Sequence, residues 1–127
     1  MMMQKNLIKI MVVDDAAFMR IVLKDILKNL GYTNIIEAPD GLAAIEQYKK
    51  FKPDLVTMDV NMPKMDGIQA LKQIVKINPM AKVIMVTAVE QRYIVQEAIR
   101  NGAKDYIVKP FDRAMVGTVI ERVLNTR

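Results

Sequence analysis

The sequence contains no cysteine, no histidine and no tryptophan. Without cysteine, disulfide bonds, thiolate catalysis and cysteine-ligated metals are excluded. Without histidine, the chain cannot act as its own histidine kinase, and any bound metal must be held by oxygen ligands. Long apolar runs are also missing, because no stretch approaches the ~20 residues that a membrane span needs. The first six residues form no signal-peptide core, so we expect a cytoplasmic protein that does not associate with membranes.

The remaining composition is that of one globular domain. Of the 127 residues, 52% are hydrophobic and 26% are charged, which suits a single core beneath a charged surface. We expect residues 1–127 to form one domain without an output domain. The net charge of +5 is interpreted as scattered lysines, and we expect no nucleic-acid partner.

Two hydrophobic patterns alternate five times along the chain. Short apolar runs predict strands at 7–13, 34–38, 55–58, 83–87 and 105–108. A segment with helical periodicity follows each run, at 16–30, 41–51, 68–77, 91–101 and 112–124. The first helix is expected to bury a stripe made of Phe18, Ile21, Val22, Ile26 and Leu27. Glycine and proline residues separate several of the segments.

This alternation predicts an α/β protein with helices on both faces of a parallel sheet. Right-handed crossovers leave few topologies, and we expect the doubly wound, flavodoxin-like (βα)5 sheet of order 2-1-3-4-5. Ligands of such sheets bind outside the carboxyl ends of the strands. Four of the predicted strands end in polar residues, which should therefore converge: Asp14, Asp15, Asp59, Thr87 and Lys109.

The three carboxylates in this set predict a metal ion. They repel one another unless a cation lies among them, and a site of oxygen ligands alone suits a hard ion. Mg²⁺ is the expected ion, with Mn²⁺ as the alternative. A lysine and a threonine beside that ion suit a phosphoryl group. The residues alone therefore predict a metal-dependent phosphoryl site.

Six motifs, in this order, resemble the receiver domain of bacterial and archaeal response regulators. They are Val-Val-Asp-Asp at 12–15, Met-Asp-Val-Asn-Met-Pro at 58–63, Met-Asp-Gly at 65–67, Thr-Ala at 87–88, Gly-Ala-Lys-Asp-Tyr at 102–106 and Lys-Pro-Phe at 109–111. Each motif alone is weak, but together they cover essentially the whole chain. Within the family, the stand-alone chemotaxis regulators are the most similar.

The resemblance implies that Asp59 is the phosphoacceptor, since a carboxylate can attack a phosphoryl group and form an acyl phosphate. It implies a metal site made of Asp15 as a direct ligand, Asp14 through water, Asp59, and the backbone carbonyl of Asn61. From the residues alone, the two adjacent aspartates could also cap the following helix. Val89 stands where related regulators often carry a polar residue. With Asn61 it would flank the hydrolytic water, so we expect an altered rate of self-hydrolysis.

The resemblance also assigns residues that respond to phosphorylation. Thr87 and Lys109 would bind the phosphoryl oxygens, and the small Ala88 would leave room for the donor. A cis peptide bond between Lys109 and Pro110 would aim the lysine inward. Tyr106 would be the switch aromatic, which turns inward when Thr87 moves towards the phosphoryl group.

The implied function is a phosphorylation-dependent signalling switch. A sensor histidine kinase would donate the phosphoryl group, and a phosphatase is a further expected partner. The fourth helix, fifth strand and fifth helix would then bind a protein target, for which a motor switch protein is the favoured example. That surface would carry Arg92, Arg100, Lys104, Tyr106 and Arg113, and so would favour an acidic partner. The chain would catalyse only its own phosphorylation and dephosphorylation, and is not expected to be an enzyme.

Several alternatives remain. A phosphorelay shuttle and a receiver cut from a longer regulator fit the same motifs. A Mg²⁺-dependent aspartyl-phosphate phosphatase would carry a second aspartate two positions after Asp59, where this chain has Asn61. A nucleotide or flavin binder needs a Gly/Ser/Thr-rich loop after the first strand, where residues 14–17 are Asp-Asp-Ala-Ala. A pseudo-receiver typically lacks the aspartate or the lysine, and this chain keeps both.

Overall fold

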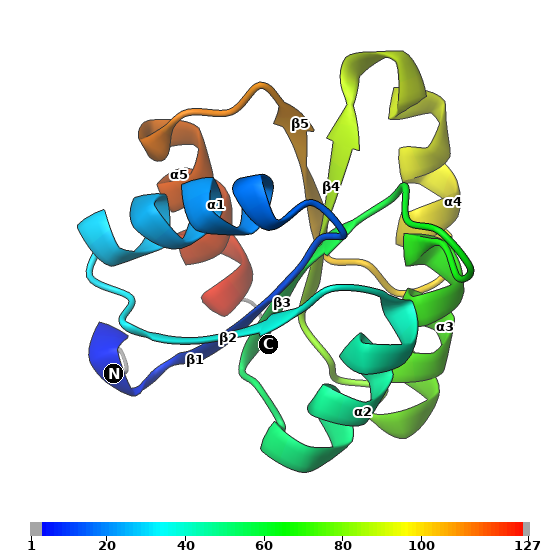
Figure 1. The fold of residues 1–127 in the computed structure, drawn as a ribbon, viewed down its shortest axis with the longest axis horizontal. Helices are drawn as coiled ribbons and strands as arrows, with labels where there is room; N and C mark the ends of the chain where they lie inside the picture. The colour runs from blue at the N-terminus through cyan, green and yellow to red at the C-terminus, as the bar shows by residue number, and fades with distance from the viewer. Residues whose placement is uncertain (1–3, 126–127) are drawn as a thin grey trace.

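The computed structural model describes residues 4–125, apart from the side chain of Val89. Five parallel strands form one sheet of order β2-β1-β3-β4-β5, which confirms the predicted topology. Helices α1 and α5 cover one face, and α2, α3 and α4 cover the other (Figure 1). The strands are β1 (Lys9–Val13), β2 (Asn34–Ala38), β3 (Leu55–Asp59), β4 (Val83–Ala88) and β5 (Asp105–Lys109). The helices are α1 (Ala17–Asn29), α2 (Gly41–Phe51), α3 (Gly67–Ile77), α4 (Val95–Arg100) and α5 (Arg113–Leu124), with 3-10 turns η1 (Lys5–Leu7) and η2 (Val89–Ile94).

The central strands are apolar because both of their faces are covered. Every residue of β3 is buried, as expected for a parallel strand in the middle of a sheet. Alternate residues point into two separate cores. Met58 packs with α2 and α3, whereas Leu55 packs with α1 and α5. Thr57 is the polar exception in β3, and its buried hydroxyl has no hydrogen-bond partner among the described residues.

Aspartates begin three of the helices and thereby set where the connecting loops end. The side chains of Asp40, Asp66 and Asp112 each accept a hydrogen bond from a backbone N–H in the first turn of α2, α3 and α5. Such caps satisfy donors that the helix itself leaves free. At Asp66 the cap is reciprocal, because the Gln69 side chain accepts from the Asp66 N–H. The loop between β3 and α3 is therefore held at a defined point beside the carboxyl end of the sheet.

Two predicted boundaries were wrong. The first strand begins at Lys9, not at residue 7, because residues 5–7 form a 3-10 turn and the side chain of Leu7 is 62% exposed. The helix predicted over 91–101 is a 3-10 turn through Ile94, and only Val95–Arg100 are α-helical. Side-chain periodicity does not separate these two helix types over so short a segment.

The expected apolar stripe of α1 was wrong at its N-terminal end. Phe18 is 72% exposed and Ile21 is 55% exposed, whereas Leu23 and Leu27 are buried. In its first turns, helix α1 therefore packs on the sheet with a different face from the one that the pattern predicted. No helix in residues 4–125 is long and apolar enough to cross a membrane.

Candidate functional site

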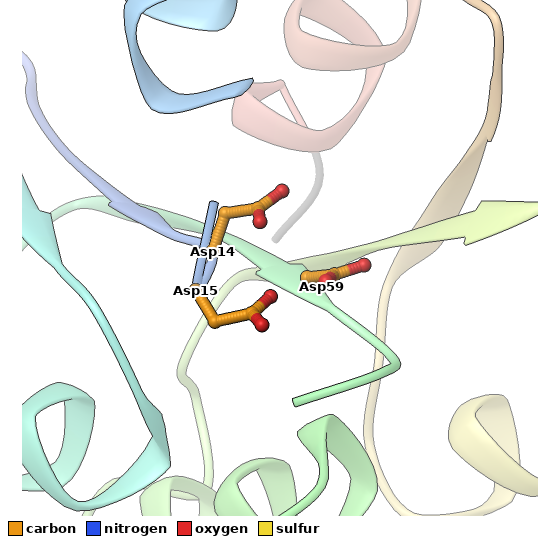
Figure 2. Close-up of side chains that lie close together, drawn as sticks. All are labelled: Asp14, Asp15 and Asp59. Carbon is orange, nitrogen blue, oxygen red and sulfur yellow. The ribbon is translucent and has the colours of Figure 1, made fainter. Parts of the chain in front are cut away.

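Three aspartates meet at the carboxyl ends of β1 and β3, the two strands that lie next to each other at the centre of the sheet. Figure 2 shows Asp14, Asp15 and Asp59 with their carboxylates turned to the same side. One oxygen of each lies within 4.8 Å of one oxygen of each of the others. Asp14 and Asp59 are buried, and Asp15 is exposed. The structure thus brings together the three carboxylates that the sequence predicted to converge.

Lys109 supplies the positive charge that faces this cluster. It is the last residue of β5, and its Nζ lies 3.4 Å from Asp59 Oδ1 and 3.5 Å from Asp14 Oδ2. The peptide bond between Lys109 and Pro110 is cis, which is the isomer that the resemblance implied. One ammonium group therefore stands against three carboxylates, and the cluster keeps an excess of negative charge.

The electrostatics of the cluster act most strongly on Asp59. Burial and, second, the neighbouring Asp14 charge raise the pKa of its carboxyl group from 3.8 to about 6. Lys109 lowers the pKa by its charge and hydrogen bond, but it does not compensate for burial and repulsion. Without a further cation, the ionised form of Asp59 is therefore disfavoured.

The donor set fits a hard divalent cation. Two oxygens bound to one ion at 2.0 to 2.6 Å lie at most about 5 Å apart, and the three carboxylates already meet that limit. One oxygen of Asp14 accepts from the Ala16 N–H at 2.9 Å, while its other oxygen faces Lys109. Receiver domains bind Mg²⁺ at such an acidic site, and the ligands here are of the kind that Mg²⁺ takes.

Arg20, which the sequence reasoning missed, holds the backbone of the cluster in place. Its Nη1 donates to the main-chain carbonyl of Asp14 at 2.6 Å, and its Nε donates to Glu37 Oε1 at 3.0 Å. Lys24 also pairs with Glu37, at 2.9 Å. Hydrogen bonds from Lys24 and Arg20 lower the pKa of the Glu37 carboxyl, so Glu37 stays charged. Helix α1 is thereby tied to the turn that carries Asp14 and Asp15.

Gly67 allows the loop after β3 to close tightly against Asp59. A Cβ atom added at Gly67 would lie 2.1 Å from the backbone oxygen of Asp59, which no real contact allows. The Gly67 N–H donates to the carbonyl of Val60 at 2.9 Å, and this hydrogen bond holds the start of α3 against the end of β3. The Met-Asp-Gly motif signalled this glycine in the sequence, but its reason is visible only in three dimensions.

Among residues 4–125, the remaining predicted site residues form no hydrogen bond to the cluster. Thr87 is buried at the end of β4, and its hydroxyl donates to the carbonyl of Ala88 at 3.2 Å. Asn61 is exposed in the loop after β3. Tyr106 is half-buried and lines an open groove with residues of η2 and α4, among them Tyr93. The side chain of Val89 lies outside the part of the chain that the structure describes.

Comparisons with known proteins agree on one family. Residues 10–121 match the response regulator receiver domain. The chemotaxis protein CheY of Thermotoga maritima is 51% identical over 115 residues, covering 91% of this chain and 96% of that protein. The chemotaxis protein CheY of Bacillus subtilis is 51% identical over 117 residues, covering 92% and 98%. The CheX–CheY–BeF3–Mg²⁺ complex of Borrelia burgdorferi contains a similar chain, with a TM-score of 0.88, 37% identity, and coverage of 94% of this chain and 90% of that one.

Proposed function

The chain belongs to the response regulator receiver family, and from this premise we propose that Asp59 is the residue that accepts the phosphoryl group. The chain is a receiver of the type found in CheY chemotaxis regulators, which are signalling proteins and not classical enzymes. The observation that carries the assignment is the meeting of Asp59 with Asp14, Asp15 and Lys109 at the carboxyl edge of the sheet. Asp59 is buried beside a cation and between two other carboxylates, as a phosphoacceptor assisted by a metal would be.

In the proposed reaction a carboxylate oxygen of Asp59 attacks the phosphorus of a phosphohistidine on a partner kinase. The P–N bond breaks, its electron pair stays on the imidazole, and an acyl phosphate forms on Asp59. Catalysis consists of positioning and charge stabilisation, as in phosphoryl transfer generally. Lys109 lies close enough to Asp59 to pair with the transferred oxygens, and Ala88 offers little bulk to an approaching donor.

We propose Asp14, Asp15, Asp59 and the backbone carbonyl of Asn61 as the ligands of Mg²⁺, with Mn²⁺ as an alternative ion. When bound, the ion neutralises the excess negative charge and polarises the phosphoryl oxygens. Asp14 and Asp15 hold their positions because Arg20 fixes the turn between β1 and α1. A relative solved with BeF3, a mimic of the phosphoryl group, and Mg²⁺ supports this assignment.

The proposed output is a shift between two conformations of the α4–β5–α5 surface. Thr87 would exchange its hydrogen bond to Ala88 for one to the phosphoryl group, and Tyr106 would follow. In the structure Tyr106 lines the open groove. Its inward turn would then follow phosphorylation. Four basic residues of the surface are exposed and would favour an acidic partner segment: Arg92, Arg100, Lys104 and Arg113.

The partners proposed are a sensor histidine kinase as donor, a protein target on the α4–β5–α5 surface, and a phosphatase. Control of chemotaxis is the favoured output because the CheY relatives match over nearly their full length. A motor switch protein is then the natural target. The expected cytoplasmic location, the single-domain organisation, and the roles of Asn61 and Val89 in setting the hydrolysis rate remain parts of this proposal.

Incubation with acetyl phosphate, followed by intact mass measurement, tests the proposed reaction. We expect the gain of one phosphoryl group in the presence of Mg²⁺, and no gain with a chelator or in Asp59→Asn. Asp25→Asn is a matched control, because Asp25 is an exposed aspartate of α1 away from the cluster. Equal phosphorylation of the parent and Asp59→Asn would refute the assignment. A folded protein that gains no phosphoryl group and binds no beryllofluoride would be a pseudo-receiver.

A further inference from the structure

A cavity of about 650 Å³ opens at the amino ends of the strands, at the edge of the sheet opposite the aspartate cluster. Its lining includes Ile8, Pro53 and Ala81, which lie just before β1, β3 and β4. Strand β3 has five residues, so roughly 16 Å of strand separates this edge from the carboxyl edge. The cavity is therefore a separate feature that the phosphoryl chemistry does not use.

The walls of the cavity are largely apolar and aromatic. Ile8 and Ala81 are almost fully buried, and Tyr32 and Tyr48 add two buried aromatic side chains to the lining. Met80, at its rim, is 67% exposed. A volume of this size lies within the ~300–1,000 Å³ range of small-molecule sites. The volume and the apolar part of the lining suit a compact apolar body.

Polar groups around the cavity give it a positive excess. Four lysines line it against two carboxylates, namely Lys5, Lys49, Lys52 and Lys82 against Asp54 and Glu121. Two of these lysines are already engaged. Lys5 Nζ donates to the carbonyl of Leu30 at 2.9 Å, and Lys82 Nζ donates to that of Leu124 at 3.0 Å.

The other two lysines stand at the C-terminal end of α2 and are uncommitted. Within residues 4–125, neither Lys49 nor Lys52 forms a hydrogen bond or ion pair through its side chain, and both are exposed. Lys52 ends α2 in the left-handed conformation, with φ of 48°, where glycine is the usual residue.

The lining of the cavity also includes Tyr48, which carries a hydroxyl group. The Tyr48 hydroxyl accepts from Asn78 Nδ2 at 3.0 Å, which leaves its own hydrogen free to be donated. The Asn78 Oδ1 accepts from the Met80 N–H at 3.0 Å, which fixes the orientation of the amide. Tyr48 thus brings an aromatic ring and a free donor to the cavity that Lys49 and Lys52 also line.

We propose that this cavity binds a small amphipathic carboxylate. Its apolar body would lie against Tyr48, Pro53 and Ala81, and its carboxylate would lie between Lys49 and Lys52. A ligand with several phosphates is disfavoured, because the lining also carries the carboxylates of Asp54 and Glu121. A single negative charge on an apolar body matches a lining that has the two uncommitted lysines and a small positive excess.

Titration with 2-naphthoate, followed by backbone NMR, tests this proposal. We expect saturable shifts at Tyr48 and Ala81, and about tenfold weaker binding of the neutral 2-naphthamide. Lys49→Met and Lys52→Gly should each weaken naphthoate binding about fivefold, as expected for one exposed ion pair. Lys50→Met is the matched control, because Lys50 neighbours Lys49 on α2 but does not line the cavity.

Lys52→Gly separates binding from folding. Glycine adopts the left-handed conformation without strain, so this variant should melt at or above the temperature of the parent while it loses affinity. Shifts that do not saturate, equal binding of the amide, or equal weakening by Lys50→Met would overturn the proposal. Shifts confined to the aspartate cluster would also overturn it.

Discussion

Replacing Asp59 with asparagine should stabilise the metal-free protein, although it removes the residue on which the proposed function depends. Asp59 is 6% exposed and lies beside Asp14, so its charged form is disfavoured in the folded state. The rise in pKa from 3.8 to about 6 corresponds to about 3 kcal/mol of lost stability at neutral pH. Asparagine keeps the size of the side chain and removes the charge.

The size of this effect depends on pH. Because the folded-state pKa is raised, the penalty is absent below pH 3.8, grows between 3.8 and about 6, and is complete above that. At pH 7.5 in a chelator, Asp59→Asn should gain about 2 kcal/mol of unfolding free energy, because the pairing with Lys109 is already included in the pKa of about 6 and the buried asparagine amide still loses part of its hydration, which offsets part of the 3 kcal/mol. This corresponds to about 8 °C in Tm for a domain of this size.

Urea denaturation in a chelator at pH 4.5 and pH 7.5 measures this difference. The gain should be large at pH 7.5 and mostly lost at pH 4.5. Asp25→Asn, which removes an exposed charge, should change stability little at either pH. If Asp59→Asn is no more stable than the parent at pH 7.5, the repulsion and burial argued for the cluster are wrong.

Further predictions concern neighbouring features of the site and core. Mg²⁺ should raise the Tm of the parent, because it binds only the folded state, and Asp14→Asn should stabilise the metal-free protein; thermal scans with and without Mg²⁺ check both. Arg20→Met should weaken Mg²⁺ binding about tenfold in calorimetry by freeing the Asp14 turn, and unchanged affinity would refute its positioning role. Thr57→Val should add about 1 kcal/mol in urea denaturation, because it removes an unpaired buried hydroxyl. Gly67→Ala should lower stability by more than 1 kcal/mol and slow phosphorylation, because its Cβ would displace the Asp59 backbone.

The topology and the aspartate cluster could be predicted because both follow from local patterns. Apolar runs that alternate with helical periodicity allow few arrangements of a parallel sheet. Polar residues at the ends of those runs must then meet at one edge, and the structure brings Asp14, Asp15, Asp59 and Lys109 together there. The resemblance of the motifs added a predicted chemical role for each residue, which spacing alone does not supply.

What could not be predicted depends on how distant segments approach one another. Phe18 and Ile21 fit a helical stripe, but the docking of α1 on the sheet leaves them exposed. The contact of Arg20 with the Asp14 carbonyl, and the close approach of Gly67 to Asp59, require the folded backbone. The cavity at the amino ends of the strands is lined by residues from segments far apart in the sequence, so no local motif predicted it.

The most direct test of the central claim is to locate the phosphorylated residue. After reaction with acetyl phosphate and Mg²⁺, borohydride reduces an acyl phosphate to the alcohol, so a phosphorylated aspartate becomes homoserine. Asp59 and the Asp14–Asp15 pair fall on different tryptic peptides, because Lys24 and Lys49 lie between them. We predict homoserine at Asp59 alone, and none without Mg²⁺. Homoserine at Asp14 or Asp15, or modification that does not need Mg²⁺, would contradict the account.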